Sequence, residues 1–181
     1  MPDNPVLEAM HTRRSCRKFS STPVPDQLID QVVDTGLWAA NGMGYQKPII
    51  IKVTDRALRD KISAVNCKIG GWKPTFDPFY GAPALLIVLA PADWRNRVYD
   101  GSLVMGNLML AAHTLGLGSC WIHRAKEEFE LPEFKQMLAD LGLEGEWEGI
   151  GHCALGYSDG GEAAPKPRKD GRVFQLPVQG R

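Results

Sequence analysis

An excess of charge of either sign is missing from this chain of 181 residues. Lysine and arginine together number 21, and aspartate and glutamate together also number 21. A nucleic-acid-binding domain needs clustered excess positive charge on one of its faces. We therefore expect no nucleic acid among the partners of this protein.

A long apolar run is missing as well. The longest one covers residues 82–92 and is interrupted by Pro83 and Pro91, whereas a helix needs about 20 apolar residues to cross a bilayer. The opening stretch, MPDNPVLEAMHTRRS, has an early aspartate and no apolar centre, which is unlike a signal peptide. We therefore expect no membrane partner and a cytoplasmic location.

Cysteine is scarce, and the four that occur are Cys16, Cys67, Cys120 and Cys153. In an intracellular chain of this length, reduced thiols are expected rather than a disulfide framework. Cys120-x-x-His123 and the adjacent pair His152-Cys153 do not have the usual spacing of zinc ligands, so we expect no metal. Cys120 as a nucleophile with either histidine as its base stays open, beside the ordinary role of a cysteine in an apolar core.

The common phosphate-binding loops are also absent. There is no loop that ends in Gly-Lys-Ser or Gly-Lys-Thr. The segment GLGS at residues 116–119 follows a predicted helix and enters a predicted strand, which is the reverse of the order in a dinucleotide-binding fingerprint.

The chain is organised around residues 98–123, VYDGSLVMGNLMLAAHTLGLGSCWIH. The pattern predicts a helix over residues 101–115, with Asp100 as its N-cap. Apolar side chains go almost all the way round this helix, which is typical of a helix buried at the centre of a fold. Gly116 suits the left-handed position after a helix end, and residues 119–122 then form a short predicted strand.

Three residues interrupt the apolar surface of this central helix: Gly106, Asn107 and His113. In one interpretation, Gly106 lets another backbone come close and the two polar side chains find internal partners. In the other, part of the helix faces a second subunit. The sequence alone leaves both interpretations open.

The remaining chain alternates predicted helices and strands, which indicates one domain over residues 1–181 with a layered α/β or α+β fold. Helices are predicted at residues 5–11, 25–40, 56–65 (capped by Asp55) and 132–141, and strands at residues 49–54, 84–89 and 148–155. Residues 66–83, rich in proline, glycine and aromatic side chains, form either a lid over a pocket or a packed loop. Residues 158–181 lack periodicity and form a predicted extended arm.

Positive charge gathers in two segments at opposite ends of the chain, residues 13–18 and residues 166–172. They could converge on a single anion such as a phosphate monoester, which carries about −1.5 to −2 charges and pairs well with arginine. Ser15 would add a hydroxyl donor. The alternative is that the two segments are separate, solvated surface charges.

Several motifs together resemble the nitroreductase family of FMN-dependent enzymes over essentially the whole chain. They are RRSCRKF at residues 13–19, the apolar strand at 85–89, the helix at 100–115, the LGLG turn at 115–118, ALGY at 154–157 and PKPRK at 165–169, in the family's order. The resemblance implies a central, mostly antiparallel sheet flanked by helices, with an extended C-terminal arm. It also implies a homodimer with FMN at the two-fold interface, the central helix in that interface and the arm across the partner.

The resemblance implies specific roles at the cofactor. Arg13, Ser15, Lys166 and Arg168 would hold the FMN phosphate, and Arg14 would help there. Arg17 would lie near N1 and the C2 carbonyl of the flavin, and Gln46 would face the ring or the ribityl chain. The backbone of Cys120, Trp121 and Ile122 would lie along the isoalloxazine. The charge of Arg17 would favour the reduced, anionic ring.

Two departures from the family pattern stand out. The flavin loop of the family has an asparagine two positions before the glutamine, where this chain has Gly44; Asn41 is the candidate that would compensate. The insertion that covers the flavin in longer members is reduced here to residues 66–83, which leaves the substrate open.

The implied activity is ping-pong hydride transfer. NADH or NADPH would reduce the flavin at N5 and leave, and a nitroaromatic, quinone or similar acceptor would take its place. The chemistry belongs to the cofactor, so no side chain is assigned as catalytic acid or base. The alternatives are a non-catalytic FMN carrier or redox sensor that uses Cys120, and a specialised flavin dehydrogenase or dehalogenase on the same fold.

Overall fold

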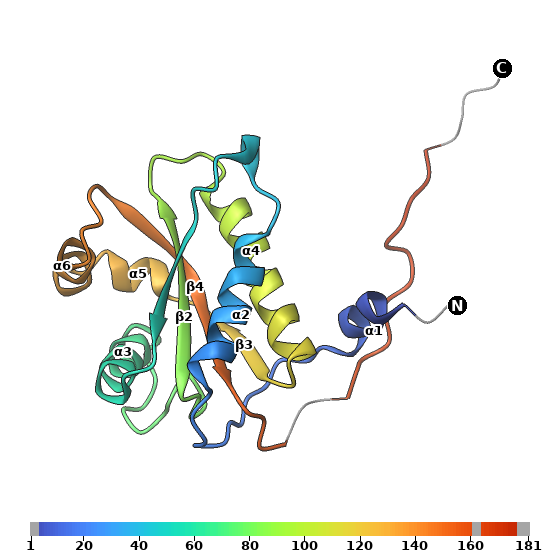
Figure 1. Cartoon of the computed structure of the whole chain (residues 1–181), viewed down its shortest axis with the longest axis horizontal. Coiled ribbons are helices and arrows are strands. Elements are labelled where there is room, and N and C mark those ends of the chain that lie inside the picture. Colours follow the sequence, from blue (N-terminus) through green and yellow to red (C-terminus); the bar gives the residue numbers. More distant parts are fainter. Residues whose placement is uncertain (1–3, 161–163, 177–181) are drawn as a thin grey trace.

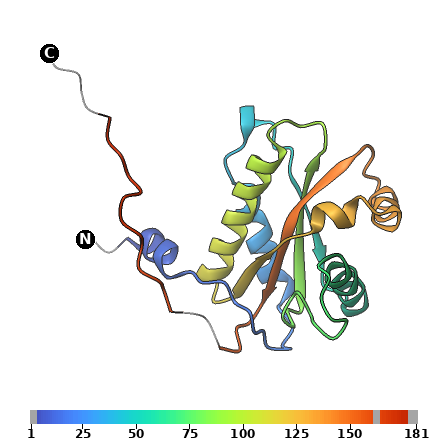
Figure 2. The same cartoon turned by 180° about the vertical axis from the view of Figure 1, so that it is seen from behind.

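A computed structural model describes residues 4–160 and 164–176 of the chain. Its centre is a four-stranded sheet in the order β1-β2-β4-β3, in which every neighbouring pair is antiparallel. The strands are β1 (Ile49–Val53), β2 (Ala84–Pro91), β3 (Gly118–Ile122) and β4 (Trp147–Gly156). Figures 1 and 2 show this sheet between two layers of helices, which confirms the predicted α+β fold.

Helices cover both faces of the sheet. One layer consists of α2 (Asp26–Leu37) and α4 (Arg97–Thr114), and the other consists of α3 (Arg56–Ile69), α5 (Ala125–Phe129) and α6 (Pro132–Asp140). β2 lies between them, because Leu86 and Val88 pack with the first layer while Leu85 and Ile87 pack with the second. The continuous apolar run of this strand therefore reflects burial on both faces.

The central helix differs from its prediction at its start. α4 begins at Arg97, so Asp100 lies inside the first turn instead of capping it. The Asp100 carboxylate accepts hydrogen bonds from the Gly42 N–H at 2.9 Å and from the Trp94 indole N–H at 2.7 Å. The aspartate therefore ties the short helix η1 (Gly42–Gly44) to the beginning of α4.

The prediction that α4 is buried all round is also wrong. Val104 and Leu108 are buried, but Leu103 is 49% exposed, and a Cβ built on Gly106 would have no atom within 4 Å. The Asn107 side-chain amide donates to the Thr35 carbonyl, and His113 Nε2 lies 2.8 Å from Thr12 Oγ1 of α1 (Pro5–Thr12). The polar side chains thus find partners, while one apolar side of the helix stays open.

Residues 66–83 are packed against the body of the molecule around Asp77 and Phe79, whereas Trp72 and Phe76 stay partly exposed. The first four of them end α3, and Phe79 is fully buried. The Asp77 carboxylate accepts from Arg59, from Ser63 and from the backbone N–H groups of Phe79 and Gly81. The short helix α5 was not predicted from the sequence.

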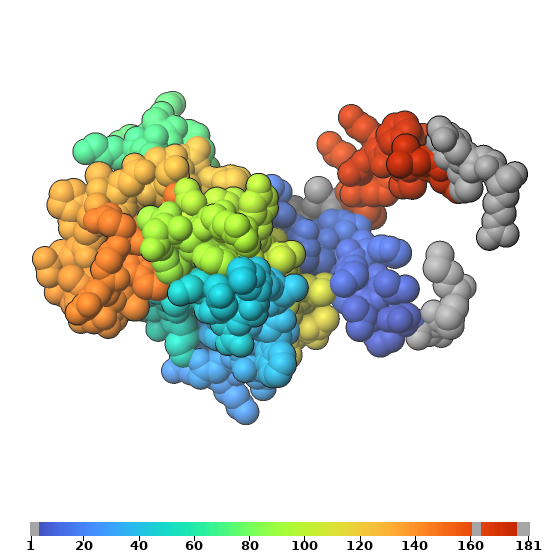
Figure 3. All heavy atoms as spheres, turned by 90° about the horizontal axis from the view of Figure 1, so that it is seen from above, coloured from blue at the N-terminus to red at the C-terminus, as the bar shows by residue number. Residues whose placement is uncertain are grey.

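The C-terminal arm leaves the body of the molecule without forming a helix or strand over residues 164–176. Figure 3 shows α1 and these residues projecting from the same end of the body. The rest of the predicted arm at residues 161–163 and 177–181 lies outside the described residues. No helix in the described part of the chain combines the length and the apolar character needed to cross a membrane.

Candidate functional site

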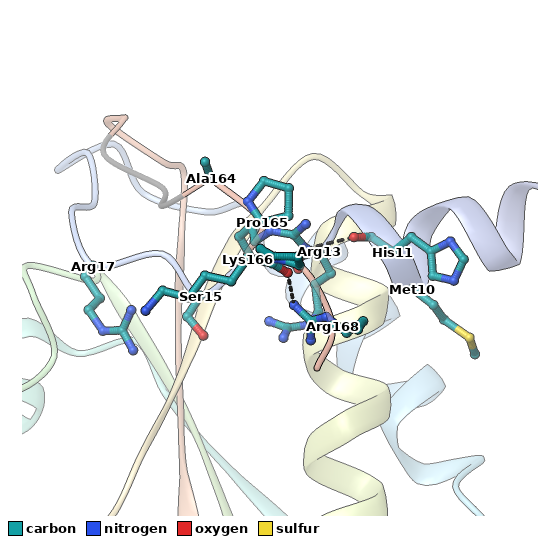
Figure 4. A pocket seen from close by; sticks show the side chains of 11 residues that line it. Met10, His11, Arg13, Ser15, Arg17, Ala164, Pro165, Lys166 and Arg168 are labelled. Carbon is teal, nitrogen blue, oxygen red and sulfur yellow. Dashed lines mark hydrogen bonds between the residues drawn. The ribbon is translucent and has the colours of Figure 1, made fainter. Parts of the chain in front are cut away.

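The structure brings the two basic segments together at one cavity of about 880 Å³. Its lining consists of Met10, His11, Arg13, Arg14, Ser15 and Arg17 on the N-terminal side, and of Ala164, Pro165, Lys166, Pro167 and Arg168 from the arm (Figure 4). Met10 and His11 were not singled out from the sequence. They lie in the last turn of α1, directly before the basic segment.

The N-terminal half of the cavity is held in place by backbone pairing. After α1 ends at Thr12, Ser15 forms a parallel bridge with Ser119, and the Cys16 N–H donates to the Ser119 carbonyl at 2.9 Å. Farther on, the Phe19 N–H donates to the Tyr80 carbonyl at 3.3 Å. The segment that carries Arg13 and Arg17 therefore lies along the outer edge of β3, at the beginning of that strand.

The cavity is strongly positive. Five of its lining residues are arginine or lysine and none is acidic. Arg13 Nη1 and Arg14 Nε are buried without a hydrogen-bond partner among the described residues, although Arg14 Nη1 donates to the carbonyls of His11 and Arg13. A phosphate group would supply acceptors for these donors and compensate the mutual repulsion of the cations, so the residues present fit a phosphate-bearing ligand.

The backbone of β3 offers polar groups next to this cavity. Antiparallel strands alternate residues that bond to the neighbouring strand with residues that point away from it. The Ser119 carbonyl points away from β4, because it accepts from Cys16. Trp121 has the same parity, so its N–H and C=O face the open edge of the sheet, where a planar ligand with polar atoms on its rim could lie.

Cys120 is buried beside this edge and is a poor candidate for a nucleophile. Burial raises the pKa of its thiol, and the nearby charge of Arg17 and a hydrogen bond with Ser15 oppose that shift only in part. Reactive cysteines are usually exposed and have a lowered pKa. His152 is fully buried and lies 2.8 Å from Glu128, so it is not free to act as a base for Cys120.

Asn41 and Gln46 are not part of the cavity. The Asn41 side-chain oxygen accepts from the Gln46 N–H at 2.9 Å, and both residues line a separate hollow with Leu37 and Ala39. Their loop is tied to the first turn of α4, whereas the cavity adjoins the last turn near His113. Thirteen residues of helix separate these turns, which corresponds to about 20 Å.

The fold and this cavity define an α+β protein with a positively charged cavity at the open edge of its sheet. Among the described residues, no three His, Cys, Asp or Glu side chains gather as a metal site. The sequence profile of the nitroreductase family matches residues 10–68 and 71–157. The chain belongs to the nitroreductase family.

Individual relatives agree with this assignment. A Methanothermobacter thermautotrophicus protein, named as a candidate NADH dehydrogenase/NAD(P)H nitroreductase, is 34% identical over 64% of this chain and 59% of its own length. The FMN reductase [NAD(P)H] of Bacillus subtilis is 25% identical over 76% of this chain and 64% of its own length. The chain thus spans less than two thirds of either relative.

A solved structure is similar over nearly the whole chain. The crystal structure of a nitroreductase with bound FMN from Bacteroides fragilis is 27% identical, has a TM-score of 0.84, and covers 96% of this chain and 100% of its own.

Proposed function

We propose that this protein is an FMN-dependent oxidoreductase that passes reducing equivalents from NADH or NADPH to a nitroaromatic, quinone or similar acceptor. The observation that carries the proposal is the positive cavity, whose Ser15 pairs with Ser119 at the beginning of β3, two residues before Trp121. Bound FMN would supply the redox chemistry, accepting hydride from the donor and giving electrons to the acceptor.

The side chains of the cavity would bind and orient the cofactor. Arg13, Ser15, Lys166 and Arg168 would hold its phosphate, with help from Arg14. Arg17 lies on the strand side of the cavity, apart from the Arg13, Lys166 and Arg168 group (Figure 4). Its charge is near enough to Cys120 to oppose the rise in the thiol pKa, so it would stand beside the ring and favour the anionic reduced form.

The residues of β3 would position the ring. The backbone of Trp121 would meet the ring at the strand edge, with Cys120 and Ile122 beneath it. The donor and the acceptor would bind in turn at the same face of the flavin, which gives a ping-pong order. No side chain of the cavity is assigned as an acid or base.

We also infer a homodimer of one-domain subunits, in which the arm at residues 158–181 crosses the partner. The open side of α4 carries Tyr99, which is 72% exposed, and Leu103; the arm carries the exposed Val173, Phe174 and Leu176. Exposed apolar surface of this extent is typical of an interface. Antiparallel packing of two α4 helices would also bring Asn41 and Gln46 of one copy to the cavity of the other.

The burial of Cys120 counts against the alternative of a redox sensor that uses this thiol. A flavin carrier without turnover, and a flavin dehydrogenase or dehalogenase, remain distinguishable by experiment. The visible spectrum of the purified protein comes first, with the released cofactor identified after denaturation. We expect a two-banded flavin spectrum and about one FMN per chain.

Anaerobic addition of NADH or NADPH then separates an enzyme from a carrier. We expect rapid bleaching of the flavin bands with at least one nicotinamide, and their return when a nitroaromatic or quinone is added. Bound FMN that neither nicotinamide bleaches would replace the enzyme by a carrier. A protein that stays colourless after incubation with FMN would contradict the proposed function altogether.

A further inference from the structure

A row of aromatic side chains lies on the surface between α3 and β2. The ring centroids of Trp72 and Phe76 are 5.0 Å apart, and those of Phe76 and Tyr80 are 6.0 Å apart, both in edge-to-face arrangements. Trp72 is 39% exposed and Phe76 is 38% exposed. Aromatic side chains have a large apolar surface to bury, so a row left open to this extent is suited to cover a flat ligand.

Arg124 stands at one end of this row. Its guanidinium carbon lies 4.2 Å from the centroid of the Trp72 ring, and the residue has a φ of 80°, in the left-handed region that favours glycine. The left-handed backbone conformation is less favourable by about 1–2 kcal/mol for a residue other than glycine, and residues strained in this way cluster at binding sites. The sequence offered no signal for it, because the strain arises only when β3 turns into α5.

The turn at Arg124 is fixed by a buried polar network. The Asn66 side-chain amide donates to the His123 carbonyl at 2.9 Å and to Glu128 Oε1 at 2.6 Å. The other oxygen of Glu128 lies 2.8 Å from His152 Nε2. Asn66, Glu128 and His152 are all fully buried, so the position of Arg124 is set by the core and not by solvent.

The aromatic row begins and ends next to the proposed flavin site. At one end, the Tyr80 carbonyl accepts from Phe19, two residues after Arg17. At the other end, Arg124 follows Ile122, the last residue of β3, by two residues. Figure 2 shows β3 leading into α5 beside α3. The row therefore flanks the same stretch of the molecule as the free edge of β3.

The N–H groups of the Arg124 guanidinium are available to a ligand. The guanidinium makes no hydrogen bond or ion pair among the described residues, and its central carbon lies over the ring of Trp72. Stacking through the face leaves the N–H groups on the rim of a guanidinium free to bind a carboxylate at two points.

Other charged side chains lie near Arg124, but none forms an ion pair with it among the described residues. The hollow beside it also contains Lys126, Glu127 and Glu148. Glu148 accepts from Arg97 at 2.9 Å and lies 3.9 Å from Lys126. Two cations and two carboxylates line this hollow, and Glu148 is already paired with Arg97 and Lys126, so it is not a partner of Arg124.

We propose that Arg124 and the aromatic row select the electron acceptor, and that the preferred acceptor is an aromatic molecule with a carboxylate or similar anionic group. Its ring would pack against Trp72 and Phe76, and its anionic group would bind the free rim of Arg124. This inference rests on the proposed function, because it requires the flavin to lie along β3.

The test uses FMN-loaded protein and benzoate, an aromatic carboxylate that flavins do not reduce, with benzamide as its neutral counterpart. Binding is measured by equilibrium dialysis and by the change in the flavin absorption spectrum. The variant is Arg124→Gly, which folds readily because glycine adopts positive φ without strain. Lys126→Ala is the matched control, since it removes a positive charge two residues away. Trp72→Leu is a second variant that removes only the stacking platform.

We expect benzoate to bind the parent protein at least tenfold more tightly than benzamide does. Arg124→Gly should weaken benzoate binding at least tenfold and leave FMN content and benzamide binding unchanged. Trp72→Leu should weaken benzoate binding to a smaller degree, and Lys126→Ala should change it less than twofold. As an independent readout, Arg124→Gly should lower kcat/KM for 4-nitrobenzoate but not for 4-nitrobenzyl alcohol.

The outcomes separate the two levels of inference. The role of Arg124 alone is overturned if FMN-loaded protein does not bind benzoate, or if the Arg124→Gly variant binds benzoate as tightly as the parent protein. Equal loss in Lys126→Ala would also overturn it, because general positive charge would then explain the binding. A protein that takes up no FMN overturns the proposed function and this inference with it.

Discussion

At the residue scale, the two kinds of cation in the cavity have different surroundings. Arg13 and Arg14 each have a buried nitrogen atom without a hydrogen-bond partner among the described residues, as expected for side chains that bind an anionic ligand. Arg17 is exposed and stands apart, and its charge lies near enough to Cys120 of β3 to oppose the rise in the pKa of that thiol. This difference suggests that binding and redox tuning are carried by separate side chains only a few residues apart.

Arg17→Ala tests this division of roles. We expect it to slow the reduction of bound FMN by NADH or NADPH roughly tenfold, equivalent to about 1.4 kcal/mol of lost stabilisation, with a smaller change in FMN affinity. Stopped-flow absorbance under saturating FMN measures the rate. Lys18→Ala is the matched control, because Lys18 is already paired with Asp159 at 2.8 Å. Identical reduction rates in Arg17→Ala and the parent would show that Arg17 has no such role.

At the element scale, the sequence predicted most helices and strands, since each has a strong local signal. The strand at Ala84–Pro91 is apolar throughout, and the Asp55 side chain caps α3 as predicted. The start of α4 was misplaced because Asp100 has a distant partner, Gly42, that no local pattern reveals. The five-residue helix α5 is too short for periodicity to be recognised.

In the candidate site, too, features with a local sequence signal were predicted and features that depend on tertiary contacts were not. The basic segments were visible as local runs of charge, so their meeting could be anticipated. Arg124 gave no signal, because its left-handed backbone and its stacking on Trp72 arise from tertiary structure. The separation of Asn41 and Gln46 from the cavity was equally hidden, since it depends on the length of α4.

The loop between α3 and β2 gives a prediction about pH. Burial alone would raise the pKa of Asp77, but hydrogen bonds from Arg59, Ser63, Gly81 and Phe79 outweigh burial and hold the pKa below its usual value. A carboxyl whose pKa is lower in the folded state stabilises it above the unfolded pKa, and this stability is lost as the pH falls through the folded pKa. The ionised form of Asp77 should therefore stabilise the fold at neutral pH.

We expect Asp77→Asn to lower the free energy of unfolding at pH 7 by about 2 kcal/mol, because hydrogen bonds to a charged group are lost. The difference from the parent should shrink as the pH falls from about 5 to 3. Urea denaturation at several pH values measures this. Asp93→Asn is the control, since Asp93 is exposed and its carboxylate makes no hydrogen bond within the described residues. A difference that stays constant with pH would contradict the prediction.

At the scale of the whole molecule, each chain has the positively charged cavity near one end of α4 and the loop with Asn41 and Gln46 near the other end. The apolar side of α4 between them is open, and so is the surface of α1 that carries Val6 and Met10. The proposed two-fold partner would account for all three observations at once, because it would cover the apolar surface and bring the loop of one copy to the cavity of the other. Cofactor binding and dimer formation should then be coupled.

Leu103→Arg tests this coupling. Placing a charge in the middle of the open side of α4 should convert the protein to a monomer, as measured by light scattering after size-exclusion chromatography. Because the contacts from the loop of the partner would then be missing, we expect at least a tenfold loss of FMN affinity, although the variant itself changes no cavity residue. Leu141→Arg is the matched control: Leu141 is 59% exposed just after α6, on the layer remote from α4, and its replacement should leave both mass and FMN content unchanged. A monomeric Leu103→Arg variant that binds FMN as tightly as the parent would show that each chain holds its cofactor alone, and the loop at Asn41 would then need another role.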